Sequence, residues 1–418
     1  MLVGAIAIAD TFGGLVKDIF PATLFLRSLM VGFLIIYILR PSTNRQDLRI
    51  LWLALIGYLL GRVAIDSIIF QDLKVLFLEI SATLRLLYFP LLFTYLHRQI
   101  ERGNISSSDI RRMLSLYGWL ILASLLLGHV TGLGGTIGGR GVEMEGGKGF
   151  MIGANEVGLM LLLTAPFVGA DMMRFLRSTW LGGLVQLIVY AAAGWHVFTK
   201  SSLIAVLTSA FSVYRAFVKL GQFSKWLVRI LLLGVGIFFV SLVLKSLEAI
   251  QAFALDTFFA ALLNDGLLAF LFRGRQYFIA AIYPQLIEHD LSGLFLLFGA
   301  GEFFIRDLSI GPMMLDQGEG TTFEMDLFDL VGAYGVVGAL LFCTVVTTML
   351  RKSGRIRIPL DIKIVIFCVL IHAFMAGHVF FSPQVTTILA LVLLYFRGHG
   401  DRPFHRRYFQ KKKVSNLI

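Results

Sequence analysis

Paired cations and paired carboxylates occur together in residues 245–326, the one long stretch of this chain that interrupts its apolar segments. The stretch contains Arg273-Gly274-Arg275, then Gly299-Ala300-Gly301, then Glu324-Met325-Asp326. Guanidinium groups bind phosphate oxygens in bidentate geometry, and a carboxylate can take a proton from a hydroxyl group. Ordinary connections between helices have only about 4–6 residues. We therefore expect this stretch to act on a substrate rather than only to connect its neighbours.

The two arginines lie in an apolar setting. Residues two apart do not share a helix face, so Arg273 and Arg275 would converge only in a turn or at a helix end, which Gly274 allows. Apolar residues flank them at 267–272 and 277–282, as in amphipathic helices on a membrane surface. A loop made soluble by two arginines is the simpler alternative, and these flanks disfavour it.

The acidic group has the pattern Glu324-x-Asp326-x-x-Asp329, and Gly335-x-x-Gly338 follows it. Its first two carboxylates stand just before an apolar segment, and the third is one turn further in. Such a carboxylate can act as a general base, pair with an arginine or bind a cation. The spacing supports structural ion pairing as well as it supports catalysis.

A second polar region begins in the segment 132–149, where half of the residues are glycine and which includes Arg140 and Lys148. Successive amides of such a chain can form an anion-binding nest, although a flexible loop with two stray cations explains the composition equally well. Asn155 and Glu156 follow at the start of an apolar run. Asparagine there is a common helix cap, whereas a carboxylate at membrane depth needs a partner.

Lys200 lies in a short polar turn, Thr199-Lys200-Ser201-Ser202, between two apolar runs. Its ammonium group can extend to the membrane interface along the aliphatic stem. Alternatively, the short turn holds it rigidly on the same side as the long stretch.

The amino-acid composition predicts that these residues belong to an integral membrane protein. Hydrophobic residues make up 57% of the chain and charged residues 15%, whereas soluble domains have about 25% charged residues. Mean hydropathy is +0.81. No cationic segment precedes an apolar one at the start, so we expect no cleavable signal peptide. The two cysteines lie inside apolar runs, which argues against a disulfide framework or a thiolate metal site.

A membrane-spanning helix needs about 20 apolar residues. Residues 1–19 are ambiguous because Asp10, Lys17 and Asp18 interrupt them. From there on, this length rule predicts spans near 20–40, 49–70, 75–97, 113–133, 151–173, 178–197, 201–220, 226–244, 327–350, 361–379 and 383–397.

Lysine and arginine gather in alternate connections and in the C-terminal tail. The positive-inside rule makes these segments cytoplasmic and the long stretch periplasmic or extracellular. It also explains the net charge of +11 without nucleic acid as a partner. The rule leaves the outer cations unexplained, which are Lys74, Arg140, Lys148, Lys200, Lys245, Arg273, Arg275 and Arg306.

The predicted organisation is a membrane bundle over 1–244, an outer loop over 245–326, further spans over 327–397 and a basic tail over 398–418. The predicted fold class is all-α, a polytopic helical bundle of about 11–12 transmembrane helices whose large outer loop contains short amphipathic helices. No internal repeat is visible, which weakens the interpretation as a secondary transporter.

The order and common side of four motifs resemble the bacterial superfamily of O-antigen ligases and polysaccharide polymerases. They are Lys148-Gly149-Phe150…Asn155-Glu156, Thr199-Lys200-Ser201, Gly274-Arg275 and Glu324…Gly335-x-x-Gly338. Each motif alone is weak, but with the span layout the resemblance covers about residues 20–397.

The resemblance implies an inverting membrane glycosyltransferase that uses no metal or other cofactor. Its donor would be a glycan on undecaprenyl pyrophosphate, its acceptor a glycan or lipid, and its site the outer face of the bacterial cytoplasmic membrane. A flippase and a chain-length regulator are possible partners. The implied catalytic residues are Glu324, Asp326 and Arg275, and the implied binding residues are Arg273, Arg275, Lys200, Arg140, Lys148, Asn155 and Glu156.

One position departs from the family pattern. Ligases of this family typically have a histidine eleven residues before the first glycine of Gly-x-x-Gly, and Glu324 stands at that position here. The change favours a polymerase of O-antigen or exopolysaccharide repeat units over a lipopolysaccharide ligase. It also leaves the choice of base open between Glu324 and Asp326.

A lipid-linked oligosaccharide flippase or other transporter is the alternative from a different class. A transporter places ionisable residues deep within its spans. Most such residues here lie near span ends, but Arg62, Asp66, Glu79 and Arg85 do not. They either serve transport or pair with one another within the bundle.

Overall fold

The computed structural model describes most of the predicted membrane bundle. The described residues are 22–40, 46–134, 148–151, 154–197, 199–217, 293–313, 325–353, 358–377 and 379–397, with the isolated residues 7, 8, 11, 284 and 288.

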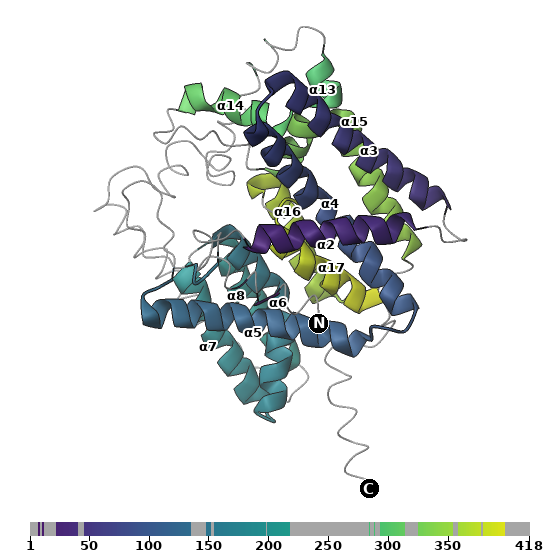
Figure 1. Cartoon of the computed structure of the whole chain (residues 1–418). Helices are drawn as coiled ribbons and strands as arrows, with labels where there is room; N and C mark the ends of the chain where they lie inside the picture. Colours follow the sequence, from purple (N-terminus) through teal and green to yellow (C-terminus); the bar gives the residue numbers. More distant parts are fainter. Residues whose placement is uncertain are drawn as a thin grey trace.

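The protein is all-α, as the composition predicts, since every regular element in the described ranges is a helix (Figure 1). These helices are α2 (Ala22–Leu39), α3 (Gln46–Phe70), α4 (Leu73–Glu101), α5 (Ser107–Thr131), α6 (Ala154–Phe175), α7 (Thr179–Val197), α8 (Lys200–Phe217), α13 (Leu294–Phe298), α14 (Glu302–Met313), α15 (Asp326–Lys352), α16 (Leu360–Ala376) and α17 (Pro383–Arg397).

Among the described residues, five helices are long and apolar enough to cross a bilayer, which indicates a membrane-embedded bundle. They are Leu48–Phe70, Leu73–Glu101, Ser107–Thr131, Asn155–Phe175 and Asp326–Lys352. The first of them, in α3, leaves many apolar side chains exposed, among them Ile50, Leu60, Ile65 and Ile68. Such a continuous apolar surface suits lipid rather than water.

The centre of the bundle is α17, whose residues from Pro383 to Phe396 are almost all buried. It packs against α4, α5 and α6, while the neighbouring α16 packs against α15, α6 and α8. These two helices therefore join a group of α2, α3, α4 and α15 to a second group of α5 to α8 (Figure 1).

The helices α2 to α8 and α15 to α17 occupy the ranges in which the apolar runs predict spans. The predicted span at 226–244 lies outside the described residues, as do the apolar flanks of Arg273 and Arg275. In the described part of the long stretch, the structure adds the short helices α13 and α14.

Candidate functional site

The helix α15 is broken at Gly335, and the long stretch docks at the break. Gly335 has φ 67° and ψ 177°, far from helical values, so the carbonyl groups before it lose their partners within the helix. The carbonyls of Gly332 and Ala333 instead accept hydrogen bonds from the amides of Ala300 and Gly301, at 2.8 and 3.1 Å. The segment 299–301 thus replaces one turn of the helix, which satisfies buried backbone groups that would otherwise be costly.

Glycine is required on both sides of this contact. Gly299 and Gly301 have φ of 86° and 85°, a region that favours glycine. A Cβ atom at Gly299 would lie 2.2 Å from the carbonyl oxygen of Ala333. On the other side, a Cβ at Gly338 would lie 2.8 Å from the Tyr58 ring. The backbone of Gly299-Ala300-Gly301 thus packs against that of α15 around Gly335, and Gly338 leaves room for the Tyr58 ring.

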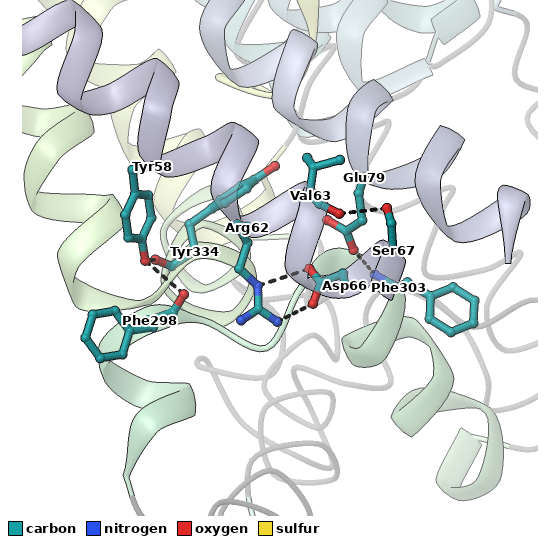
Figure 2. Close-up of polar contacts among 9 residues, drawn as sticks. All are labelled: Tyr58, Arg62, Val63, Asp66, Ser67, Glu79, Phe298, Phe303 and Tyr334. Carbon is teal, nitrogen blue, oxygen red and sulfur yellow. Dashed lines mark hydrogen bonds and ion pairs between the residues drawn. The ribbon is translucent and has the colours of Figure 1, made fainter. Parts of the chain in front are cut away.

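Tyr58 of α3 closes this contact from the side (Figure 2). Its hydroxyl group lies 2.8 Å from the carbonyl oxygen of Phe298 and 2.7 Å from that of Tyr334, and donates between them. The side chain of Tyr334 is buried in turn, with its hydroxyl 3.4 Å from that of Thr83 in α4. One hydroxyl thereby links α3, the docked segment and α15.

Beside this contact lies a group of six charged side chains, which we call the charge cluster. They come from three helices and are Arg62, Asp66, Glu79, Arg85, Glu302 and Arg306. Their three carboxyl groups are almost fully buried. Charges at such sites need partners, because burial removes their hydration.

The turn between α3 and α4 places two members of the cluster, Asp66 and Glu79, near each other. Asp72 caps α4 by accepting the amide of Lys74 at 2.8 Å. The antiparallel hairpin brings Asp66 and Glu79 to the same glycine, since a Cβ at Gly301 would lie 2.6 Å from Asp66 Oδ2 and 3.1 Å from Glu79 Oε1. Any larger residue at position 301 would push these carboxylates away from the docked segment.

Each carboxyl group of the cluster has a defined partner. The Arg62 guanidinium group donates two hydrogen bonds to the Asp66 carboxylate, at 3.0 and 2.5 Å. The two residues thus form a bidentate pair (Figure 2). Glu79 Oε1 accepts the backbone amide of Phe303 at 2.7 Å. The third carboxyl group, that of Glu302, forms ion pairs with Arg85 of α4 and with Arg306 of its own helix.

Only part of this cluster is apparent from the sequence. Intramembrane position marks out Arg62, Asp66, Glu79 and Arg85, and the positive-inside rule leaves Arg306 unexplained, whereas no such pattern marks out Glu302. Of the first four, Arg62 and Asp66 pair with each other, whereas Glu79 accepts a backbone amide and Arg85 pairs with Glu302. The only sequence signal for Glu302 is its place directly after Gly301.

The second region lies at one end of α5, α6 and α8, where two sequence motifs meet. Gly149 (φ 60°) packs against Ser124 of α5, and Ser124 Oγ accepts the amide of Phe150 at 2.9 Å. Ser201 Oγ lies 3.5 Å from the carbonyl oxygen of Asn155. A Cβ at Gly158 would lie 2.3 Å from the same Oγ, so α6 and α8 approach closely here.

The polar turn that contains Lys200 forms the cap at the start of α8. Thr199 and Ser202 bond each other reciprocally, with backbone amide to side-chain oxygen distances of 3.0 and 3.2 Å, which is the pattern of a capping box. Lys200 is therefore the first residue of α8. Asn155 and Glu156 are in the first turn of α6 and are partly exposed, as is Lys148 just before that helix.

The same end also holds two histidines that the sequence analysis did not single out. His129, in the last turn of α5, and His196, in the last turn of α7, have ring centroids 4.9 Å apart in an edge-to-face arrangement. Histidine is common at such helix ends for reasons of packing and dipole interaction. Within the described part of the chain, no group of three His, Cys, Asp or Glu side chains is placed to share a metal ion.

Asp326, one of the two candidate bases, has a structural role at the start of α15. Its Oδ2 accepts the backbone amides of Val379 and Phe380, at 2.9 and 2.8 Å. These amides belong to the turn between α16 and α17, so the carboxylate fixes that turn to α15. Asp329 Oδ2 accepts the amide of Met325 at 3.0 Å and thereby caps the same helix end.

The other predicted site residues lie outside the described residues. They are Glu324, Arg273, Arg275 and Arg140. The roles that the resemblance gives them stay predictions.

Comparisons with models of known protein families, with curated proteins and with solved structures find no match for this chain.

Proposed function

We propose that the protein is a polysaccharide repeat-unit polymerase of the cytoplasmic membrane in bacteria. It transfers a glycan from undecaprenyl pyrophosphate to an acceptor sugar on the outer face. The observation that supports this proposal most is that the backbone of residues 148–151, that of Asn155 and the turn before α8 lie at one end of the packed helices α5, α6 and α8. Segments that contain cationic and polar residues thus come together from distant parts of the chain, at the end that the positive-inside rule predicts to be the outer one.

The proposed reaction needs two kinds of group. The acceptor hydroxyl oxygen attacks the anomeric carbon of the donor, and the bond from that carbon to the pyrophosphate oxygen breaks. Undecaprenyl pyrophosphate leaves with the electron pair, and Arg275 with the lysines stabilises the charge that develops on it. The hydroxyl proton passes to a carboxylate.

We assign the proton acceptor to Glu324. The alternative, Asp326, has Oδ2 engaged by two backbone amides that fix the turn between α16 and α17. A base must also come within about 3 Å of the acceptor hydroxyl, and Asp326 is only 4% exposed. A carboxylate that fixes a turn is poorly placed for that task, which leaves Glu324 as the residue at the family position.

The test is a reconstituted transfer assay. The purified protein in lipid nanodiscs receives an undecaprenyl-pyrophosphate oligosaccharide from its source organism, and the products are separated on a gel. We expect a ladder of regularly spaced bands that disappears in Arg275→Ala. Arg112→Ala is the matched control, because Arg112 is on the predicted cytoplasmic side with 81% of its side chain exposed.

Other outcomes contradict the proposal in distinct ways. A single shifted band that requires an added lipid or protein acceptor identifies a ligase. A complete absence of product, with a donor that extracts of the same organism do polymerise, rules out both enzymes.

Transport is the second candidate, because α15 is broken within a span and the carboxyl groups of the charge cluster are buried. Broken helices and intramembrane charges are features of transporters. The partners of the carboxyl groups weaken this candidate, since Arg62 already neutralises Asp66 in a bidentate pair. Flipping of a fluorescent lipid-linked oligosaccharide in proteoliposomes, without any transfer, would establish it.

A further inference from the structure

We propose that the carboxyl group of Glu79 is a proton-binding site, and that release of its proton undocks the segment 299–303 from α3, α4 and α15. The ligand is a single proton, which exchanges with water at the end of the bundle where α3 turns into α4. The inference does not rest on the proposed glycan transfer. It concerns an acidic side chain that neither the sequence motifs nor the family resemblance includes.

The burial of Glu79 is the first observation that supports this site. The residue is 0% exposed, and its Oε1 accepts the backbone amide of Phe303 at 2.7 Å (Figure 2). The other oxygen, Oε2, is also buried, and within the described part of the chain no group donates a hydrogen bond to it. An ionised carboxylate offers about four lone-pair sites to donors. A single amide therefore leaves most of a negative charge at Glu79 without a partner.

The charged and titratable groups that face Glu79 come from three neighbouring helices, α3, α14 and α15, and from α4 itself. They are Arg62, Asp66, Glu302, Tyr334 and Arg85, with Arg306 paired to Glu302. Asp66 and Glu302 repel an ionised Glu79, and Arg62 attracts it. This arginine is already the bidentate partner of Asp66. The surroundings thus favour the neutral acid, because like charges disfavour ionisation and burial removes hydration.

The formal charge of the whole cluster leaves the state of Glu79 open, because its members are hydrated to different degrees. Three arginines and three carboxyl groups cancel when all of them are ionised. The side chains of Arg85 and Arg306 are 33% and 34% exposed, so positive charge there keeps part of its hydration. A negative charge on Glu79 has no exposed surface, which is the costly arrangement. Contacts and burial of the single group therefore decide, and both favour a bound proton.

A short path connects Glu79 with water. It stands six positions after Leu73, the first residue of α4, which is about 9 Å along the helix axis. Gln71 and Asp72, in the turn before that helix, are exposed. The positive-inside rule predicts this end to be the outer one. The pH on that side then sets how often the site is occupied.

The docked segment lies between Glu79 and a second carboxyl group. A Cβ at Gly301 would lie 3.1 Å from Glu79 Oε1 and 2.6 Å from Asp66 Oδ2. An ionised Glu79 would face the Asp66 carboxylate across this glycine, out of contact with water. Burying that ion costs more than the stronger bond to Phe303 returns. Water reaches the ion when the segment moves away, which breaks the bonds that the amides of Ala300 and Gly301 make with α15.

Hydrogen exchange at the amides of residues 299–303 measures this undocking. The purified full chain in nanodiscs is compared with Glu79→Gln over a range of pH, and the ratio of the two rates removes the intrinsic effect of pH on exchange. Glutamine keeps an oxygen for the amide of Phe303 and resembles the protonated acid. We expect a ratio of wild type to variant near one at the acidic end. The ratio should rise by up to about tenfold per pH unit, because the undocked form releases the proton that the docked form keeps.

Asp109→Asn is the matched control. Asp109 is in the first turn of α5, with 43% of its side chain exposed. We expect this variant to exchange like the wild type at residues 299–303 at every pH. A ratio of wild type to Glu79→Gln that stays constant over the whole range means that Glu79 does not change its protonation, and overturns the proposal.

A second comparison covers the case in which Glu79→Gln does not fold. In the wild type, exchange at residues 299–303 is then measured against exchange at residues 199–202, the cap of α8, in the same molecule. We expect only the first segment to lose protection as the pH rises. Parallel behaviour of the two segments overturns the proposal. Neither readout depends on glycan transfer, so a protein that makes no polymer contradicts only the proposed function.

Discussion

Gly335 in α15 faces the carbonyl group of Leu297 in α13 so closely that a Cβ atom at position 335 would lie 2.3 Å from the carbonyl oxygen. The two residues are far apart in the chain, and their contact fixes the described part of the stretch 245–326 to the apolar helix α15. It forms only because Gly335 leaves the helical conformation with φ 67° and ψ 177°. This combination of angles is essentially restricted to glycine.

We predict that Gly335→Ala releases the loop from the bundle. The added Cβ meets backbone atoms, which cannot move aside, and the backbone strain alone destabilises by about 1–3 kcal/mol. A fall in Tm of several degrees and a loss of transfer should follow, measured by thermal unfolding and by the transfer assay. Gly61→Ala in α3 is the control, because a Cβ there meets nothing within 4 Å. Equal Tm values for both variants would show that the contact is not formed.

The bond from Phe303 to Glu79 gives a second prediction. Glu79→Gln keeps a carbonyl oxygen for the amide of Phe303, whereas Glu79→Leu leaves that amide without an acceptor, which costs about 1–3 kcal/mol. We therefore expect Tm to fall clearly for leucine and little for glutamine. Limited proteolysis of the outer loop should accelerate only in the leucine variant. Glutamine that destabilises as much as leucine would show that the charge, rather than the hydrogen bond, matters.

Conservative substitutions of each carboxylate by its amide distinguish the two candidate bases, Glu324 and Asp326. Glu324→Gln should abolish transfer and leave Tm unchanged, because the amide cannot accept the proton. Asp326→Asn should retain much of the transfer activity, since its amide oxygen still accepts the bonds from Val379 and Phe380. Asp326→Ala removes both bonds and should lower Tm. Loss of transfer in Asp326→Asn at unchanged Tm would instead identify Asp326 as the base.

Sequence patterns predicted the helices well and the long-range contacts poorly, for a physical reason. Apolar runs report the length of a lipid-embedded helix directly, so α3 and α4 stand where the pattern puts them. The bond between Arg85 and Glu302 joins residues 217 positions apart, and no local pattern encodes such a pairing. Likewise, Gly335 was found as part of a family motif, but its role as the break in α15 depends on the backbone of residues 297–301.

The proposed chemistry also depends on which side of the membrane the helix ends face, and α5 allows a direct test. Asn104 precedes this helix and Leu133 follows it, and both are exposed. In a protein with Cys343→Ala and Cys368→Ala, we expect a membrane-impermeant maleimide to label Leu133→Cys in intact spheroplasts. Asn104→Cys should react only after permeabilisation, because lysine and arginine hold its end of α5 inside. The reverse pattern would put Lys148 and Lys200 in the cytoplasm, where a donor glycan already moved to the outer face cannot meet them.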